Sequence, residues 1–318
     1  MLSINKDIIN KLNNLGKAKT PFLVVISYDK QIVDIITNPL KSNEILFDIE
    51  GSFTPYINKS IDFEIVNTLS LQEYKEKFNQ VIDQIKQGNT YLLNLTAPTI
   101  IKSNLNLEEI YYIKKAKFKL LYKDKFLCFS PERFIKIVDN AIFTYPMKGT
   151  IKASIKDAKK KLLENPKELA EHTMVVDLLR NDLSMVSKDV KVLKFRYIDE
   201  VETNKGKLYQ VSSEIKGTLD PKWQENIGDI LDKLLPAGSI TGTPKKSTID
   251  IIKRVENYDR GFYSGIFGYF DGKSFDSGVL IRYIEKKENK LIYKSGGGIT
   301  LDSKLIDEYQ ELLAKVYL

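Results

Sequence analysis

The distribution of short β runs and helical stretches limits the fold of this chain more than any other feature. Between residues 20 and 66 the apolar runs FLVVISY, QIVDIIT and FEIVNT are typical of strands, because they are rich in β-branched and aromatic residues. Three further β runs, FYSGIFGYF, SFDSGVLIRYIE and KLIYKSG, lie near the other end. Helical stretches are grouped between these runs and do not alternate regularly with strands. This arrangement favours an α+β fold over a doubly wound parallel sheet.

Helices are predicted where apolar residues recur at helical spacing. From Gln72 this spacing continues to Gly88, which is placed to end the helix. Another helix is expected after Pro166, with the proline in its first turn. The remaining predictions are helices over 225–235, 247–255 and 303–316, a strand over 208–218, a strand at YLLNLTA, and two strands within 125–150 joined by a turn at Asp139-Asn140.

Composition excludes several classes of site. The 318 residues include one cysteine and one histidine, too few for a disulfide framework, a zinc cluster or a site of paired His or Cys ligands. Lys and Arg exceed Asp and Glu by 49 to 42, a net charge of +7, which leaves open a basic anion- or RNA-binding protein. The basic residues are scattered between acidic ones, however, without a Lys/Arg-aromatic stripe. We therefore expect no nucleic-acid partner.

No repeat, low-complexity tract or linker divides the sequence. One domain over 1–318 is predicted, with a short β-rich N-terminal part over 1–71. The N-terminus has polar and acidic residues where a signal peptide would need an apolar core. No apolar run approaches the ~18 residues of a membrane span. A cytoplasmic location with no membrane contact is expected.

Two glycine-rich stretches, Gly238–Gly242 and Gly296–Gly298, could bring backbone N–H groups close to an anionic oxygen. Neither is one of the common nucleotide-binding fingerprints, since the sequence contains no GxxxxGK[ST] and no GxGxxG after a strand. Taken alone, both stretches are more typical of ordinary turns.

Two pairs of glutamates are more informative. Glu168 and Glu171 share one face of a predicted helix, and Glu308 and Glu311 repeat this spacing in the last helix, with Lys315 near them. The two negative charges of such a pair repel each other, and a divalent cation bound by their oxygens would relieve this repulsion. Four glutamates from two helices could therefore hold one Mg²⁺. For either pair alone, a solvated polar face is the simpler interpretation.

Three other side chains are of types that can take part in chemistry. His172 projects away from Glu171 around the helix and is interpreted as a packing or surface residue, and Cys128 as a small buried side chain. Lys148 lies at a strand end before a Gly-Thr turn, where a lysine is ordinarily a surface charge. If desolvated, it could instead be a neutral nucleophile, and the residue pattern leaves both alternatives open.

Eight motifs in order resemble the chorismate-utilising enzymes, a family that includes anthranilate, aminodeoxychorismate, isochorismate and salicylate synthases. The resemblance covers roughly residues 72–318. The motifs are SPERF (130–134), PMKGT (146–150), ELAEHTMVVDLLRND (168–182), PAGSITGTPK (236–245), RGFYSGIFGY (260–269), IRY (281–283), GGGIT (296–300) and DEYQELLAK (307–315). The resemblance implies two packed, mainly antiparallel sheets with helices outside.

The resemblance also implies roles by position. Glu171 and Glu311 correspond to the principal Mg²⁺ carboxylates, with Glu168 and Glu308 beside them. Glu132 corresponds to the general acid that protonates the departing ring hydroxyl. The residues implied to bind chorismate are Asn94, Thr150, Thr241, Gly242, Tyr263, Arg282, Gly296, Gly297, Gly298 and Lys315.

Three positions indicate the branch of the family. By this resemblance, Leu92 occupies the position where isochorismate and salicylate synthases have a lysine that activates water. Lys148 of PMKGT matches the lysine typical of aminodeoxychorismate synthases. Anthranilate synthases resemble PIAGT over the same five positions and so have alanine there. Asn94 matches an asparagine near the incoming amine. One departure is Gln210, which stands where a histidine is common.

The resemblance therefore implies an aminodeoxychorismate synthase component I. Such an enzyme makes 4-amino-4-deoxychorismate from chorismate and ammonia, for 4-aminobenzoate and folate synthesis. Ammonia is expected from a separate glutaminase subunit in a heterodimer, because this chain lacks a recognisable glutaminase site. The alternatives are an anthranilate synthase component I, an isochorismate or salicylate synthase, or a non-catalytic anion- or RNA-binding protein.

Overall fold

The computed structural model describes residues 3–51, 56–57, 59–203 and 206–318, without the side chains of residues 167 and 201–203. In this part of the chain the strands form two large antiparallel sheets. The strands of sheet A are β1 (Phe22–Ile26), β2 (Val33–Thr37), β8 (Arg133–Val138), β9 (Ala141–Thr144), β10 (Met147–Lys152), β11 (Lys188–Thr203), β12 (Gly206–Thr218), β14 (Ile266–Phe270) and β15 (Phe275–Val279). Those of sheet B are β3 (Ile45–Ile49), β4 (Phe63–Asn67), β5 (Leu92–Ser103), β6 (Phe118–Tyr122), β7 (Phe126–Ser130), β13 (Gly242–Thr243), β16 (Tyr283–Lys287) and β17 (Lys290–Ile299).

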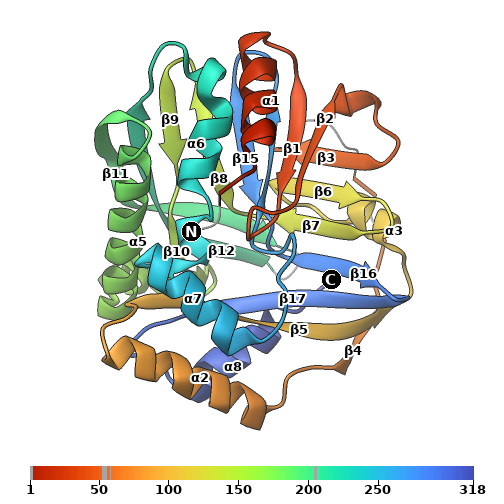
Figure 1. Cartoon of the computed structure of the whole chain (residues 1–318). Helices are drawn as coiled ribbons and strands as arrows, with labels where there is room; N and C mark the ends of the chain where they lie inside the picture. The colour runs from red at the N-terminus through yellow and green to blue at the C-terminus, as the bar shows by residue number, and fades with distance from the viewer. Residues whose placement is uncertain (1–2, 52–55, 58, 204–205) are drawn as a thin grey trace.

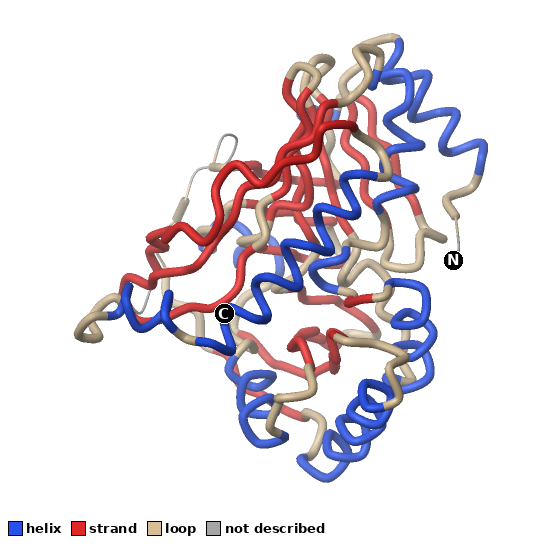
Figure 2. The backbone as a smooth tube through the Cα atoms, turned by 90° about the vertical axis from the view of Figure 1, so that its left-hand side faces the viewer, coloured by secondary structure: helices blue, strands red, loops and turns tan. Residues whose placement is uncertain are grey.

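The helices lie outside the two sheets, as Figures 1 and 2 show. They are α1 (Lys6–Lys17), α2 (Leu71–Lys86), α3 (Leu107–Ile113), α4 (Ala158–Glu164), α5 (Pro166–Ser184), α6 (Ile227–Leu234), α7 (Lys245–Glu256) and α8 (Leu305–Ala314), with short 3₁₀ turns η1 (Pro39–Lys41), η2 (Trp223–Asn226) and η3 (Gly238–Ile240). None of the helices in the described ranges is long and apolar enough to cross a membrane.

The alternation of side chains along the strands produces separate apolar layers. On β1, Phe22 and Val24 pack with residues of α5 and α6, whereas Leu23 and Val25 pack with residues of β3, β6 and β7 in sheet B. Leu93 and Leu95 on β5 pack with residues of α2, α7 and α8. The order is therefore helices, sheet A, sheet B, helices, and the predicted α+β fold of two packed antiparallel sheets is confirmed.

The N-terminal strand belongs to the same sheet as C-terminal strands. β1 runs antiparallel to β14, with Phe22 opposite Phe270 and Ile26 opposite Ile266. Sheet order in A runs β10-β12-β9-β8-β15-β14-β1-β2, so elements far apart in sequence are neighbours in space. Both halves of the chain thus contribute to sheet A.

The structure differs from the sequence predictions in several places. Helices α3 and α4 and strands β3, β6 and β11 lie where no element is predicted. Helix α1 had not been predicted, and its buried contribution is small, with Leu12 and Gly16 as its buried residues. The segment 125–150 forms four strands, β7 to β10, where two were predicted, although the turn at Asp139-Asn140 is present. The run SFDSGVLIRYIE is divided into β15 and β16, because Arg282 takes a left-handed backbone conformation with φ of 52° between them.

Candidate active site

The candidate residues gather where an end of sheet A meets an end of sheet B. A methyl group placed on Gly298 of β17 would lie 3.5 Å from the Lys148 Nζ of β10 and 3.2 Å from the Leu92 Cδ1 of β5. Lys148 therefore reaches from one sheet to the other. Asn94 lies opposite Gly298 in the β5–β17 ladder, two residues from Leu92. Three positions that the sequence analysis singled out, Leu92, Asn94 and Lys148, are thus brought together.

A β-bulge after Lys148 sets the direction of its strand. Lys148 is paired with Val211 and Thr150 with Gln210, so the register shifts at Gly149. Gly149 has φ of 74°, and a methyl group there would lie 2.6 Å from the Glu168 Oε2. Glycine is needed for both reasons, and bulges of this kind redirect neighbouring side chains at active sites. Thr150 is exposed, and its cross-strand neighbour is the Gln210 that replaces a common histidine.

The acidic pair of α8 lies beside the glycine-rich end of β17. A methyl group on Gly297 would lie 3.4 Å from the Glu308 Oε2, 3.7 Å from the Glu311 Oε1 and 3.9 Å from the Lys315 Nζ. The Lys315 Nζ is also 2.6 Å from the Glu311 Oε1 and donates to the Gly296 carbonyl at 2.8 Å. The Ser303 hydroxyl donates to the Glu308 Oε1 at 2.7 Å. The predicted proximity of Lys315 to the glutamates is confirmed.

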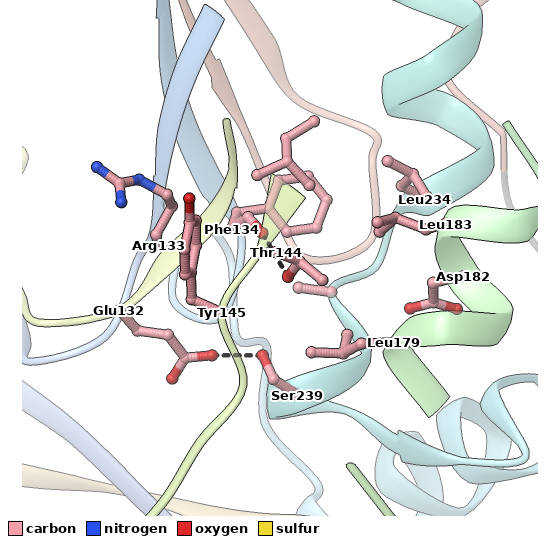
Figure 3. A pocket seen from close by; sticks show the side chains of 12 residues that line it. Glu132, Arg133, Phe134, Thr144, Tyr145, Leu179, Asp182, Leu183, Leu234 and Ser239 are labelled. Atoms are coloured by element: carbon pink, nitrogen blue, oxygen red, sulfur yellow. Dashed lines mark hydrogen bonds between the residues drawn. The ribbon is translucent and has the colours of Figure 1, made fainter. Parts of the chain in front are cut away.

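Glu132 meets the glycine-rich 236–243 loop. Its Oε1 accepts a short hydrogen bond from the Ser239 hydroxyl, and Figure 3 shows this bond beside Arg133 and Tyr145. Loss of contact with water raises the pKa of the Glu132 carboxyl, although Ser239 and the positive charges of Lys148, Lys315 and Arg282 oppose this rise. A cavity of about 10 Å³, roughly the space of one water, lies between this pair and the Asp182 side of the loop. A carboxyl that holds its proton above the usual pH range is suited to general acid catalysis.

Arg282 presents an unused donor. Its Nη1 donates to the Lys315 carbonyl at 3.3 Å, and its guanidinium lies 5.0 Å from the centre of the Tyr317 ring. Its buried Nε has no hydrogen-bond partner among the described residues. A buried guanidinium donor without a partner fits an anionic ligand, because leaving it unpaired costs free energy. Tyr263 is buried close by, and burial raises the pKa of its hydroxyl.

The 236–243 loop is attached to β5 by backbone contacts. Gly242 has φ of 126°, and a methyl group there would lie 1.9 Å from the Leu92 carbonyl oxygen, so no larger residue fits. The Asn94 N–H donates to the Thr241 carbonyl at 3.0 Å. The Thr241 hydroxyl donates to the Ala237 carbonyl at 2.8 Å, within the loop itself.

The interpretations of His172 and Cys128 agree with the structure. Cys128 is buried in sheet B. His172 is buried, and its Nε2 lies 2.7 Å from the Ser213 Oγ. Burial and the nearby charges of Arg196 and Lys148 lower the pKa of His172 to about 4, so it is neutral at physiological pH.

Two features of the site were missed by the sequence analysis. Asp182 and Lys245 form a buried ion pair at 2.8 Å that joins α5 to the end of the loop. Glu256 and Arg260 form a second buried pair at 2.6 Å beside Asn94. Both lie inside or next to the recognised motifs. Arg260 lies beyond the end of α7 at Glu256, so helical spacing does not predict the second pair.

The donor chemistry of the glutamates suits Mg²⁺, which prefers carboxylate oxygens. Glu308 and Glu311 flank one glycine of β17, while Glu168 lies beside Gly149, the neighbour of Lys148. Within the residues that the structure describes, no group of three or more His, Cys, Asp or Glu side chains is placed to hold a metal ion. The structure therefore places Glu308 and Glu311 beside one glycine and Glu168 beside another, and it does not show the four glutamates as one cluster.

Comparison with known proteins places the chain in a family. Residues 26–318 match the chorismate binding enzyme family. The chain belongs to that family. The resemblance inferred from the eight motifs is confirmed, and the protein is a chorismate-using enzyme.

Individual relatives carry more than one activity in their names. A Haemophilus influenzae protein named "Uncharacterized PabA-like protein" is 48% identical over 320 residues, 99% of this chain and 97% of that protein. Aminodeoxychorismate synthase component 1 of Klebsiella aerogenes is 32% identical over 264 residues, 78% of this chain and 57% of that enzyme. The solved structure of anthranilate synthase component I from Streptococcus pneumoniae superposes with a TM-score of 0.68 and 26% identity, covering 83% of this chain and 60% of that one.

Proposed function

We propose that this protein is an aminodeoxychorismate synthase component I, which converts chorismate and ammonia into 4-amino-4-deoxychorismate and water. The observation that carries the proposal is the position of Lys148, whose Nζ lies beside Gly298, Leu92 and the strand position of Asn94. Leucine at position 92 cannot activate water, whereas a lysine amine can act as a nucleophile. The activity in the name of the Klebsiella aerogenes relative supports the same branch.

In this proposal the chain's own residues bind and orient chorismate. The two substrate carboxylates meet Arg282, Tyr263, Lys315 and the Gly296–Gly298 backbone, since a guanidinium fork and unobstructed N–H groups suit carboxylate oxygens. Glu168, Glu171, Glu308 and Glu311 would hold Mg²⁺. When bound, the ion supplies positive charge that offsets and orients the ring carboxylate.

The proposed chemistry has two displacements. The Lys148 amine attacks C2, the ring double bonds shift, and the C4–O bond breaks while Glu132 gives its proton to the hydroxyl, which leaves as water. Ammonia then attacks C4, the double bonds shift back, and the C2–N bond breaks to release the lysine amine. Atoms and electrons balance, because one ammonia enters and one water leaves. Product identification from chorismate, ammonium and Mg²⁺ by chromatography with mass spectrometry tests the proposal, and anthranilate as the main product would overturn it.

Replacing Glu311 by glutamine should abolish turnover while the protein stays folded. The substitution removes one ligand charge from an exposed position and leaves the buried Leu312 untouched. Mn²⁺ binding, followed by EPR in the presence of chorismate, should weaken in the same variant. The matched control is Asp307→Asn, an exposed carboxylate on the same helix, which should bind metal normally. Full activity of the native enzyme in excess chelator would contradict the assignment.

Nitrogen should be accepted as ammonia and not as glutamine. We propose that a glutaminase subunit supplies ammonia in the cell, so the purified chain should work with ammonium salts at raised pH, where more NH₃ is present. With glutamine alone it should produce no aminodeoxychorismate until a glutaminase is added. The measurement is product formation with each nitrogen source. Glutamine-dependent turnover by this chain alone would refute the expectation.

A further inference from the structure

One side of β5 has a gap in its strand pairing. β17 pairs with β5 on the other side from Leu93 to Ile101. On the gap side, β13 pairs with Leu92 and Leu93 only, and β4 joins at Ile100. Backbone groups buried between these two strands need other partners, because an unpaired buried N–H or C=O is costly.

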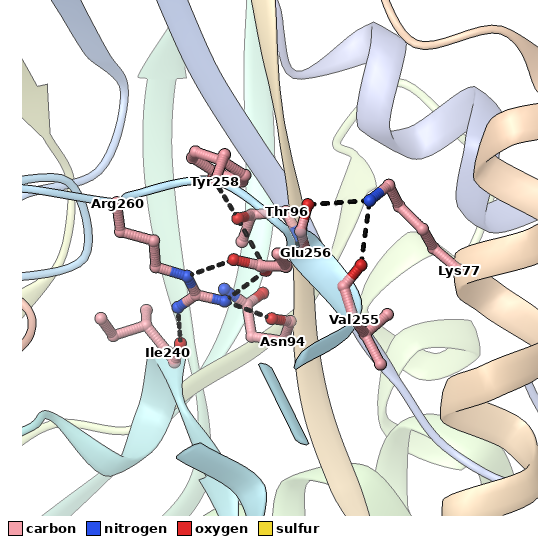
Figure 4. A network of polar contacts seen from close by, with 8 residues as sticks. All are labelled: Lys77, Asn94, Thr96, Ile240, Val255, Glu256, Tyr258 and Arg260. Atoms are coloured by element: carbon pink, nitrogen blue, oxygen red, sulfur yellow. Dashed lines mark hydrogen bonds and ion pairs between the residues drawn. The ribbon is translucent and has the colours of Figure 1, made fainter. Parts of the chain in front are cut away.

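A buried ion pair occupies the first part of this gap, as Figure 4 shows. The Arg260 Nη2 donates to the Asn94 carbonyl at 2.7 Å, where the β13 ladder has ended. Two residues further along, the Thr96 N–H donates to the Glu256 Oε1 at 2.8 Å. One donor and one acceptor at successive alternate residues are what a neighbouring strand would have supplied.

The two charged side chains are fixed to each other and to the loop. Arg260 donates through its Nε to the Glu256 Oε2 at 2.8 Å and through its Nη2 to the Glu256 Oε1 at 2.6 Å. Its Nη1 donates to the Ile240 carbonyl of the 236–243 loop at 3.5 Å, and its guanidinium lies 4.5 Å from the centre of the Tyr28 ring. Arg260 and Glu256 are 2% and 1% exposed as side chains. Because its donors are directed at protein acceptors, Arg260 is placed to organise the site rather than to contact substrate.

Both backbone groups of Asn94 are therefore held from the same side. Its N–H donates to Thr241 of the loop and its carbonyl accepts from Arg260. Leu93 and Leu95 face the outer helices, so alternation directs Asn94 to the face that Leu92 shares with Lys148. A shift of the loop or of this strand would move Asn94 relative to the Lys148 amine.

We propose that Arg260 is a positioning residue that, paired with Glu256, replaces the missing strand along β5 and fixes Asn94 relative to the 236–243 loop. The kinetic part of this inference rests on the proposed function, whereas the structural part does not. Lysine at position 260 keeps the charge but lacks the planar fork, so it cannot serve Glu256, Asn94 and Ile240 together.

The test compares Arg260→Lys with Lys119→Met. Lys119 is buried 4.0 Å from the buried Asp48 carboxylate, on β6, which three strands of sheet B separate from β5. In Arg260→Lys, amide hydrogen exchange measured by mass spectrometry should accelerate about tenfold or more over 94–97 and 237–243 and stay unchanged over 126–130. With ammonium as nitrogen source, kcat should fall about tenfold or more with little change in the KM for chorismate, as expected when groups are misplaced only slightly. Lys119→Met should change neither these two segments nor kcat.

Each outcome decides the inference. Unchanged exchange over 94–97 and 237–243 would overturn it, as would faster exchange spread equally over sheet B. If Arg260→Lys does not fold, the native protein still tests the inference. The Thr96 amide, which donates to Glu256, should exchange as slowly as the β5 amides paired with β17. Fast exchange of this amide would show that Glu256 does not replace a paired strand. If the native enzyme makes no aminodeoxychorismate, the proposed function fails while both exchange measurements keep their meaning.

Discussion

Replacing Lys148 by alanine is expected to lower formation of 4-amino-4-deoxychorismate by about 10³-fold or more, because it removes the proposed nucleophile. The substitution should leave the fold intact. Lys148 is only partly buried, and the Gly149 bulge that directs it stays intact. Chorismate should therefore still bind, and ammonia that reaches C2 directly would give traces of 2-amino-2-deoxyisochorismate or anthranilate. Chromatographic product analysis separates these compounds.

Two further variants sharpen this expectation. Lys148→Arg should fail as well, because guanidinium stays protonated and offers no free electron pair. Lys152→Ala removes an exposed lysine from the same strand and should leave turnover normal. Intact-mass spectrometry of the native chain should reveal a chorismate-derived adduct that is absent from Lys148→Ala. Near-normal aminodeoxychorismate output from the alanine variant would eliminate Lys148 as an obligatory nucleophile.

Local signals in the sequence were sufficient for many elements of the fold. The helix predicted over 72–88 is α2, which begins after a capping box between Ser70 and Glu73 and ends just before Gly88. Signals of this kind act over a few residues and survive in any fold. Helix α1 carries a signal of the same kind that the sequence analysis did not use, because Ile8, Ile9, Leu12 and Leu15 recur at helical spacing after the N-cap Asn5. The sequence analysis merged the four strands of 125–150 into two, although Pro131 and Pro146 lie in the two connections that it did not predict.

The candidate site was predictable as a set of residues but not as an arrangement. Ordered motifs identified Lys148, Glu132 and the glutamates, because those residues resemble family positions one by one. The role of Arg260 depends on a gap between β13 and β4 that exists only after the sheet is assembled. Ser239 likewise acquires its role by meeting Glu132 from a loop more than a hundred residues away in sequence. Contacts of such long sequence separation have no local pattern from which to read them.

Replacing Glu132 by glutamine is expected to lower turnover by about 10²- to 10⁴-fold, the range for loss of a general acid. Glutamine keeps the size of the side chain and accepts a hydrogen bond from Ser239, yet it has no acidic proton to give to the leaving hydroxyl. The KM for chorismate should change little, because the lost interaction belongs to bond breaking. Steady-state kinetics with ammonium measure both constants. A variant with near-native kcat would remove Glu132 from the mechanism.

The pH dependence of kcat should follow the protonation of the Glu132 carboxyl. Burial raises the pKa of Glu132, so the protonated acid persists above the usual carboxyl range, and kcat should fall as pH rises through that pKa. The Ser239 hydroxyl donates to the carboxylate and lowers this pKa, as do the charges of Lys148, Lys315 and Arg282. Ser239→Ala should therefore move the descending limb to higher pH, measured at a constant calculated concentration of NH₃. Ser239→Thr, which retains the hydroxyl, should leave the limb near its native position. A limb that moves to lower pH in the alanine variant would mean that Ser239 stabilises the protonated acid, and the hydrogen bond would then have the opposite role.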